Sequence, residues 1–335
     1  GDVASRRRRR GRPRWPRRIW LLMKRSFTQN LRSKIINVAR SVSALGLAAL
    51  FQMQFGTFGG ADARSVADRV AVLSFSAISM AQLSIMKTLD IFGREKSVVS
   101  RERDRGYYSG LEYLLAKVLS ELPMDVGFAL LHGEAMRSLC HPRIPRGMLL
   151  SSLAMGTLAA ATLGFAVGAA VPDGNMAITM GAPLMIIHMI TGIINPSGVR
   201  EGQAPPAWPW KLVRRLSPIR WAIQSMCVNE FRGMELDTRG LRDVPQMGGL
   251  ALVKSGDDVL KRLNLPLDPA HALRALGWLS AGHVAAAALF LHVTGPSHLR
   301  GGAAGAEADE EQAVEEAEAA EEGDGWSRHL RGGAA

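Results

Sequence analysis

DIFGREKSVVSRERDRGYYSGLEYLLAKVLSELPMD, from Asp90 to Asp125, is the stretch of this 335-residue chain that decides its fold. Its middle, from Arg94 to Arg105, is dense in acidic and basic residues, and we call it the charged segment. Apolar sequence of helical length lies on both sides, whereas a single charge at the centre of a bilayer costs about 2.5–3.5 kcal/mol on insertion scales. The charged segment is therefore predicted to face water between two membrane helices, and its basic excess predicts the cytoplasmic side. The alternative, a surface helix of a soluble protein, requires amphipathic flanks, which this sequence mostly lacks.

The charge of the chain is concentrated at its ends. Nine arginines lie between residues 6 and 18, and without them the formal net charge falls from +11 to +2. We expect residues 1–18 to form a basic, disordered head and residues 296–335 to form an acidic, low-complexity tail. The head contains RGRP at residues 10–13, which is similar to a minor-groove DNA-binding core. Because basic segments beside a membrane helix bind anionic lipid, at about 1 kcal/mol per residue, lipid contact is the preferred interpretation and nucleic-acid binding the minor one.

Hydropathy predicts six membrane-spanning helices, so the fold is expected to be all-α and polytopic, with the membrane domain at residues 19–295. The spans are expected at about residues 36–58, 70–91, 111–135, 148–171, 176–195 and 274–294, with an extracellular loop at 196–272. Windows such as 148–171 contain no charged residue and are long enough to cross about 30 Å of hydrocarbon. Residues 15–34 mix apolar and basic residues at helical spacing, which predicts an interfacial helix on the cytoplasmic leaflet. An even number of spans places both termini on that side.

The third span is the least typical, because it carries four residues unsuited to lipid: Lys117, Glu121, Pro123 and Asp125. Its uncharged run, at residues 126–131, is far too short to cross a bilayer. This helix can cross only if its polar face is buried against neighbouring helices or lines a wet cavity. Arg40, at the inner end of the first span, is expected to reach back to the interface by snorkelling.

Two patterns concern the opposite side of the membrane. Trp208, Trp210 and Trp221 in the long loop suit an interfacial aromatic belt. Arg143 and Arg146, between the third and fourth spans, fall outside if the head is cytoplasmic, which conflicts with the positive-inside rule.

Chemistry-bearing residues are sparse. Two cysteines, Cys140 and Cys227, are too few for a disulfide framework or a zinc site, and we expect free buried thiols, with an inter-subunit bridge through Cys227 as the alternative. His132 with Glu134, and Cys140 with His141, lack the spacing of a known metal site. No serine, cysteine or paired-carboxylate constellation indicates catalysis by this chain. Because the sequence lacks an initiator Met, we expect it to be part of a longer product.

Three groups of motifs follow one another within residues 20–295. The first comprises Glu95-Lys96, Arg101-Glu102, Gly106-Tyr107-Tyr108, Tyr113, Ala116-Lys117 and Glu121-Leu122-Pro123. The second is Thr191-Gly192-Ile193-Ile194-Asn195, and the third is Leu216-Ser217-Pro218 with Arg220-Trp221, Asn229-Glu230-Phe231 and Gly233. Together they resemble the membrane domain of the ABCG (White) subfamily of ABC transporters, a type II exporter. The spaced set is specific, whereas any one piece is not.

The resemblance implies the membrane-spanning part of an ATP-driven exporter of a hydrophobic or amphipathic small molecule or lipid. Such a half-transporter dimerises with an identical or different membrane domain, in the plasma membrane or an internal membrane. The resemblance assigns coupling to the ATPase to Glu95, Arg101, Glu102, Tyr107 and Tyr108. It assigns the substrate path to Met80, Leu83, Met185 and His188, and a hydrophobic valve to Ile193 and Ile194. Glu95 and Glu102, seven residues apart, fall within about 20° of each other on a helix, and we expect that face to meet the ATPase.

Two departures from the family matter. No GxxxxGK[ST] phosphate loop is present, so ATP and Mg²⁺ are expected on a nucleotide-binding domain outside this sequence, and no cofactor on this chain. HGEAMRSLCHPRIPRG, at residues 132–147, replaces the apolar second half of the family's third helix. Two other functions stay open: a membrane protein without an ATPase that has a structural or regulatory role, and a nuclear DNA-binding protein acting through its RGRP head.

Overall fold

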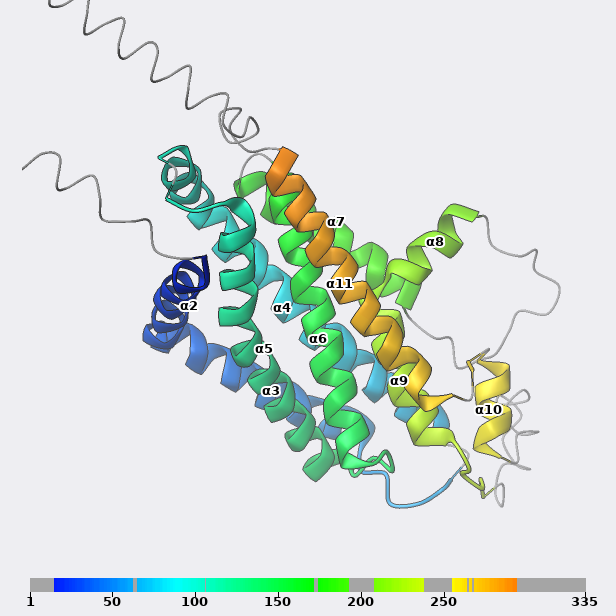
Figure 1. Cartoon of the computed structure of the whole chain (residues 1–335). Coiled ribbons are helices and arrows are strands. Elements are labelled where there is room, and N and C mark those ends of the chain that lie inside the picture. The colour runs from blue at the N-terminus through cyan, green and yellow to red at the C-terminus, as the bar shows by residue number, and fades with distance from the viewer. Residues whose placement is uncertain are drawn as a thin grey trace, which may run out of the picture.

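The computed structural model describes residues 15–62, 65–105, 107–171, 174–192, 208–237, 255–263, 265–266 and 268–293. Within these residues every regular element is a helix, as predicted, and β-structure is limited to isolated bridges. The helices are α2 (Trp15–Arg32), α3 (Lys34–Phe55), α4 (Ser65–Asp104), α5 (Gly110–Cys140), α6 (Arg146–Ala170), α7 (Gly174–Gly192), α8 (Trp208–Leu216), α9 (Pro218–Phe231), α10 (Gly256–Arg262) and α11 (Pro269–Val293) (Figure 1).

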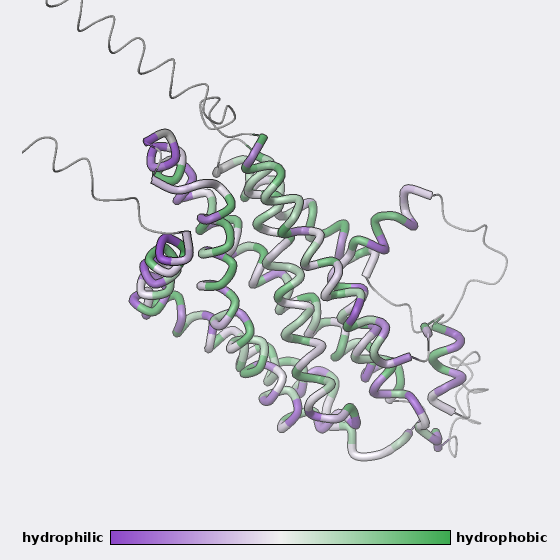
Figure 2. Tube along the Cα trace, viewed as in Figure 1, coloured by the Kyte–Doolittle hydropathy of each residue, from purple (hydrophilic) through white to green (hydrophobic). Residues whose placement is uncertain are grey.

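Six long helices, α3 to α7 and α11, form the bundle and correspond to the six predicted spans (Figure 1). Four segments are long and apolar enough to cross a membrane: α3, Ser65–Lys96 of α4, α6 and α11. In α7 the apolar part, Met176–Gly192, is shorter. Hydrophobic residues follow the bundle helices, whereas hydrophilic residues gather on α2, at the end of α4 and on α10 (Figure 2). The chain is therefore an all-α, multi-pass integral membrane domain.

Small residues allow α6 to lie at the centre, where it packs against α4, α5, α9 and α11. A Cβ atom on Gly156 would lie 2.7 Å from the Cβ of Ala222 on α9. A Cβ on Gly168 would lie 2.8 Å from the ring of Phe92 on α4. Helices in lipid associate through close packing of this kind, because burial of apolar surface supplies no driving force between them there.

The segment predicted as an extracellular loop contains a buried helix. In α9, 11 of 14 residues are buried, and the helix packs against α4, α6, α7 and α11. Its start follows from the sequence, because the Ser217 side chain accepts a hydrogen bond from the Arg220 amide and Pro218 occupies the first turn. At its other end Glu230 forms a buried ion pair with Arg69 of α4. Residues 193–207 and 238–254 of this loop lie outside the described residues.

Two predicted boundaries are wrong in part. The predicted second span ends near residue 91, whereas α4 continues through the charged segment to Asp104 without a proline to stop it. Helix α2, Trp15–Arg32, confirms the helix predicted at residues 15–34, so the predicted head overlaps it at residues 15–18, which are helical. Residues 1–14 of the head and the whole acidic tail lie outside the described residues.

The two arginines that conflict with the positive-inside rule have local partners. Arg143 donates to the backbone carbonyls of Arg232 and Gly233, at 3.3 and 3.2 Å. Arg146 pairs with Glu134 at 2.5 Å. Both arginines therefore hold neighbouring chain segments together at the end of the bundle away from the charged segment.

Candidate functional site

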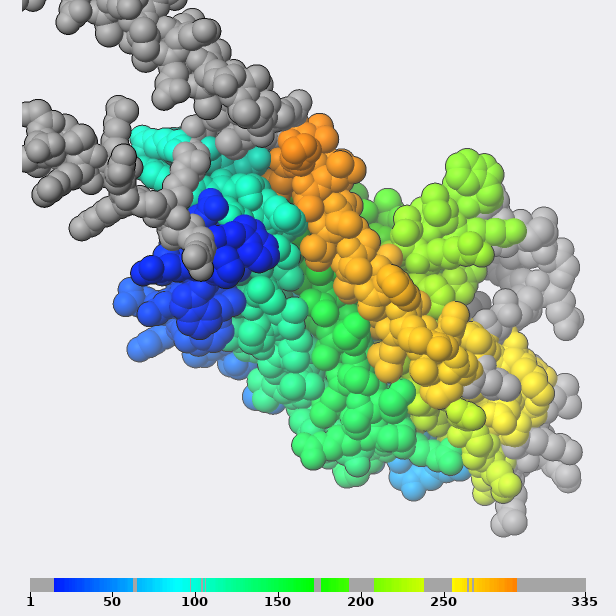
Figure 3. Space-filling model, viewed as in Figure 1, coloured from blue at the N-terminus to red at the C-terminus, as the bar shows by residue number. Residues whose placement is uncertain are grey.

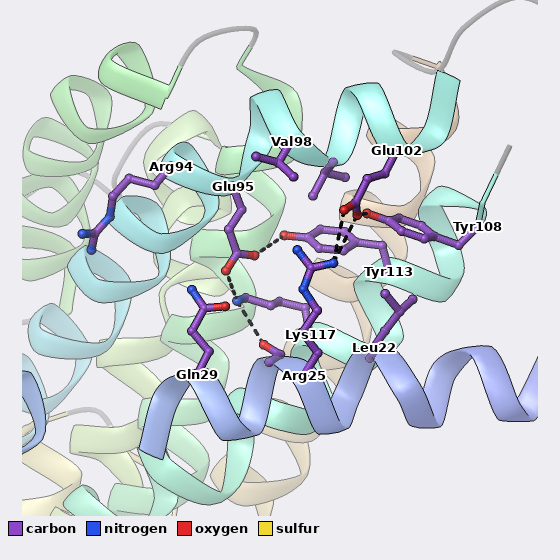
Figure 4. Close-up of a pocket in the computed structure, with 13 residues that line it drawn as sticks. Leu22, Arg25, Gln29, Arg94, Glu95, Val98, Glu102, Tyr108, Tyr113 and Lys117 are labelled. Carbon is purple, nitrogen blue, oxygen red and sulfur yellow. Dashed lines mark hydrogen bonds and ion pairs between the residues drawn. The ribbon is translucent and has the colours of Figure 1, made fainter. Parts of the chain in front are cut away.

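The charged segment meets α2 and the first turns of α5 at one end of the bundle (Figure 4). Between Asp104 and Gly110 the chain turns back, and Ser109 begins α5 with a capping box, in which it and Glu112 bond to each other's backbone amides. Arg18 of α2 then pairs with Glu112 at 3.3 Å. The turn is therefore fixed from both sides.

The acidic face of the charged segment points inward. Glu95 accepts hydrogen bonds from Lys117 Nζ at 2.7 Å and from the Tyr113 hydroxyl at 2.9 Å. Glu102 accepts from the Tyr108 hydroxyl at 2.6 Å and from Arg25 of α2 at 3.2 Å (Figure 4). The two glutamates share a side of a continuous helix, but that side meets α5 and α2.

A basic face of the same segment closes the ends of two membrane helices. Lys96 donates to the backbone carbonyl of Gly168, at 3.1 Å, and to that of Val171, both at the end of α6. Arg103 donates to the carbonyl of Leu291 in the last turn of α11, at 2.8 Å. The last carbonyls of a helix lack intrahelical partners and carry partial negative charge, so cations are stabilising there. These contacts attach the charged segment to α6 and α11.

A third face is exposed. Arg94, Val98, Arg101 and Arg105 follow one another at i, i+4, i+7 and i+11, which places them in one row, and all four are exposed. We call this row the outer stripe. Arg94 forms a surface ion pair with Asp90. Tyr107, just beyond the stripe, is 60% exposed. Of the five predicted coupling residues, Arg101 and Tyr107 are thus exposed, and Glu95, Glu102 and Tyr108 face α5 and α2.

A cavity of about 280 Å³ lies between α2, the charged segment and α5. Its walls combine the apolar side chains of Leu22 and Val99 with the polar ends of Arg25 and Lys117. Leu22, Arg25 and Lys117 are labelled in Figure 4. A second cavity, of about 180 Å³, shares Arg94 with the first and continues toward α3. Charged groups at this end of the bundle are therefore close to solvent.

A ladder of alternating charges runs from the charged segment into the bundle. Its members are Glu95, Lys117, Glu121, Lys87, Asp125 and Arg40, in that order. Four of its five contacts are 2.7 Å long, and the fifth, between Lys117 and Glu121, is 3.4 Å. Three acids balance three bases, and the steps join α5 to α4 and α3. This charged ladder buries the polar face of α5, which is the condition predicted for the third span.

The charged ladder corrects one prediction and exposes one missed signal. Arg40 does not snorkel: its side chain is 12% exposed, pairs with Asp125 and lies 4.2 Å above the ring of Phe128. Lys117, Glu121 and Asp125 are spaced by four, so they line one face of α5. That spacing is the sequence signal for the ladder, but the partner residues on α3 and α4 have no comparable pattern.

Hydrogen bonding sets the protonation of the Glu102–Tyr108 pair. Burial raises the pKa of Glu102, but the hydrogen bonds from Tyr108 and Arg25 outweigh it, so the pKa lies below the ordinary 4.5. Burial, followed by the bond to Glu102, raises the pKa of Tyr108 well above the ordinary 10.0. At neutral pH the pair is a tyrosine hydroxyl donating to a carboxylate.

The predicted substrate-path residues lie between two helices. Met80 and Leu83 are on α4, and Met185 and His188 are on α7, which packs against α4. Met80, Met185 and His188 are at most 5% exposed, and Leu83 is partly buried. The predicted valve residues, Ile193 and Ile194, lie outside the described residues.

Comparison with known proteins agrees with this architecture. Residues 17–231 match the family model of the ABC-2 type transporter membrane domain. The chain is similar to three proteins of Arabidopsis thaliana. It is 31% identical to ABC transporter G family member 7, over 75% of this chain and 33% of that protein. It is 32% identical to ABC transporter G family member 25, over 44% of this chain and 22% of that protein. It is 25% identical to member 23, over 78% of this chain and 39% of that protein.

The chain thus spans about a third of the length of the first of these relatives. Its helical bundle, its spaced motifs and the matched family model agree with one another. The chain belongs to the ABC-2 type transporter family, as a membrane domain of the ABCG (White) kind.

Proposed function

We propose that this domain is the membrane-spanning part of an ATP-driven exporter of a hydrophobic or amphipathic compound. ATP and Mg²⁺ would bind a nucleotide-binding domain outside this sequence, and a second membrane domain would complete the translocation path. The observation that carries the proposal is the attachment of the charged segment, on separate faces, to α2, α5, α6 and α11.

Such an attachment suits the transfer of mechanical work. Helix α4 is continuous from the membrane interior to the charged segment, so a displacement of its end moves the whole helix. The charged ladder passes the same displacement to α5 and α3 through short, buried contacts. A flexible loop at this place would bend and dissipate the motion.

The geometry favours a docking surface different from the acidic face predicted from spacing. Glu95 and Glu102 are engaged by Lys117 and Arg25, so we assign them a positioning role. The exposed outer stripe carries three arginines and a valine, and fits an ATPase surface that is acidic with an apolar contact point. Tyr107 extends this surface at the turn.

The substrate path proposed here runs along the α4–α7 contact. Met80, Met185 and His188 are covered within one subunit, so α4 and α7 would have to separate slightly to present them to a compound. Movement of the charged segment acts directly on one of these two helices. Ile193 and Ile194 remain the proposed valve.

The test uses the longer transporter that carries both this domain and its ATPase, reconstituted in liposomes. The variant Arg101→Glu with Arg105→Glu should abolish substrate-stimulated ATP hydrolysis and leave unstimulated hydrolysis unchanged. Arg232→Glu, an exposed arginine at the far end of the bundle, is the matched control. Full stimulation in the double variant would exclude the outer stripe as the docking surface. Absence of ATP-dependent transport in the unmodified assembly would instead favour a structural or regulatory role.

A further inference from the structure

The last turn of α11 lies beside the charged segment. Arg103 of α4 donates to the carbonyl of Leu291 at 2.8 Å. A Cβ atom on Gly110, the first residue of α5, would lie 3.3 Å from the Cβ of Leu291. Figure 1 and Figure 3 show the end of α11, in orange, at the same end of the molecule as the charged segment. The sequence that follows Val293 therefore starts at this end of the bundle.

The sequence beyond that point contains a strongly acidic stretch. Residues 307–324, which we call the acidic run, contain ten acidic residues and no basic one. The outer stripe, on the exposed side of the charged segment, carries three arginines. Asp90 offsets one of these charges, because it pairs with Arg94 at the surface. The acidic run and the outer stripe are therefore complementary in charge.

The acidic run is tethered closely enough to reach the outer stripe. Residues 294–306 connect Val293 to the run. A flexible chain of that length spans about 20 Å on average and about 45 Å at most. The stripe is about 17 Å long at 1.5 Å per residue, and Arg103 lies on the opposite side of α4, a helix about 10–12 Å across. Both distances lie within the reach of the connection.

The spacing of the charges allows many pairs at once. The three arginines of the outer stripe lie at i, i+7 and i+11 of α4. Three acids of the run repeat this spacing: Glu311, Glu318 and Glu322. The run consists mostly of Ala and Glu, which are good helix formers, so a helical form would bring these acids opposite the arginines. The pairing thus does not require the run to be extended.

We propose that the acidic run binds the outer stripe of the same chain and covers it. A single exposed ion pair is weak, but several act together here. The connection also holds the run near the stripe at an effective concentration of the order of millimolar, which a separate acidic peptide does not have. Because salt screens exposed pairs, the contact should be sensitive to ionic strength.

The contact would regulate coupling, a step that rests on the proposed function. If the outer stripe is the docking surface, the acidic run and an acidic ATPase surface compete for the same arginines. The run would then hold the domain uncoupled until the ATPase displaces it.

The test places the photo-crosslinking residue p-benzoylphenylalanine at Val98, within the outer stripe, in the full chain in detergent. Leu21, which is 51% exposed on the basic helix α2, is the control position. Cross-linked peptides are identified by mass spectrometry at low and at high salt. An equal mixture of unlabelled and isotope-labelled chains separates contacts within one chain from contacts between copies.

We expect the acidic run to cross-link to Val98 of the same chain several-fold more than to Leu21. The variant Arg101→Gln with Arg105→Gln should lower the yield several-fold, and high salt should lower it as well. A yield that is unchanged by both would overturn charge as the basis of the contact.

The variant Arg17→Gln with Lys24→Gln, at exposed positions of α2, is the matched control and should leave the yield unchanged. No cross-link from Val98 to the acidic run, or a stronger one from Leu21, would overturn the assignment to the outer stripe. Products that join labelled to unlabelled chains would identify a second copy as the partner instead. No ATPase is present, so failure here leaves the proposed transport function untouched.

Discussion

Lys117 joins the charged segment to the rest of the charged ladder, because it pairs with Glu95 on one side and Glu121 on the other. It is 3% exposed, pairs with Glu95 and Glu121, and also donates to Ser26 of α2 at 3.1 Å. Two carboxylates share this one ammonium group, so its loss leaves Glu95 with the Tyr113 hydroxyl and no cation, and leaves Glu121 and Asp125 to share Lys87.

We therefore expect Lys117→Met to destabilise the domain by on the order of 3–5 kcal/mol, the effect of removing one partner of a buried ion pair. Arg94→Gln is the control, because the Arg94–Asp90 pair is exposed and such pairs contribute about 0–1 kcal/mol. Thermal unfolding in detergent measures both. Equal midpoints for the two variants would show that the charged ladder contributes little to stability.

The Glu102–Tyr108 hydrogen bond predicts a defined pH dependence. The pKa of Glu102 is lowered in the folded state, so its stabilising contribution is complete above 4.5 and is lost as pH falls through the lowered pKa. The pKa of Tyr108 is raised, so its contribution is complete below 10.0 and lost at higher pH. The difference in unfolding midpoint between the unmodified chain and Glu102→Gln should be constant from about pH 5 to 10 and should shrink below that range. A difference that does not shrink at any pH below 4.5 would contradict the assignment.

At the scale of an element, α6 shows how glycine positions decide which helices meet. A methyl group on Gly156 would meet the Cβ of Ala222, which has no alternative rotamer and moves only with its backbone. On α11, a Cβ atom built on Gly282 would have no neighbouring atom within 4 Å.

Gly156→Ala should therefore destabilise the domain by about 1–3 kcal/mol through overpacking against α9. Gly282→Ala should be neutral or stabilising by up to about 1 kcal/mol, because alanine is the better helix former. Chemical or thermal unfolding of the two variants decides between packing and propensity. If Gly156→Ala and Gly282→Ala both lose stability, neither helix propensity nor the room for a Cβ atom explains the effect of alanine at these sites.

At the scale of the whole molecule, the number of crossings depends on α5. Three of the bundle helices, α5, α6 and α7, lie in the chain between the turn at Tyr107 and the start of α8. If α5 crosses the membrane, Tyr107 and the end of α9 lie on opposite sides of it. If α5 lies along the membrane surface, Tyr107 and the end of α9 lie on the same side.

A Tyr107→Cys variant and a Glu235→Cys variant test this directly, because both positions are exposed and both native cysteines are buried. A thiol reagent that cannot cross membranes should label one variant in sealed vesicles and the other only after permeabilisation. Labelling of both from the same side would remove α5 from the set of spans.

The bundle could be predicted from the sequence because its signals are local. An uncharged run such as residues 148–171 forms a helix in lipid, because a helix satisfies its backbone hydrogen bonds internally where no water is present. The spacing of Glu95 and Glu102 likewise placed them on one side of a helix. The helix continues because nothing in the charged segment stops it.

Only the tertiary structure decided what these faces meet. The direction in which Glu95 and Glu102 point depends on Tyr113, Lys117 and Arg25, which come from other helices. The burial of α9 depends on small residues of α6 that leave room for it. Such contacts join residues far apart in the chain, so no local pattern of hydropathy or charge specifies them. The ability of α5 to carry buried charge is likewise a property of its neighbours, because Arg40 and Lys87 neutralise it from α3 and α4.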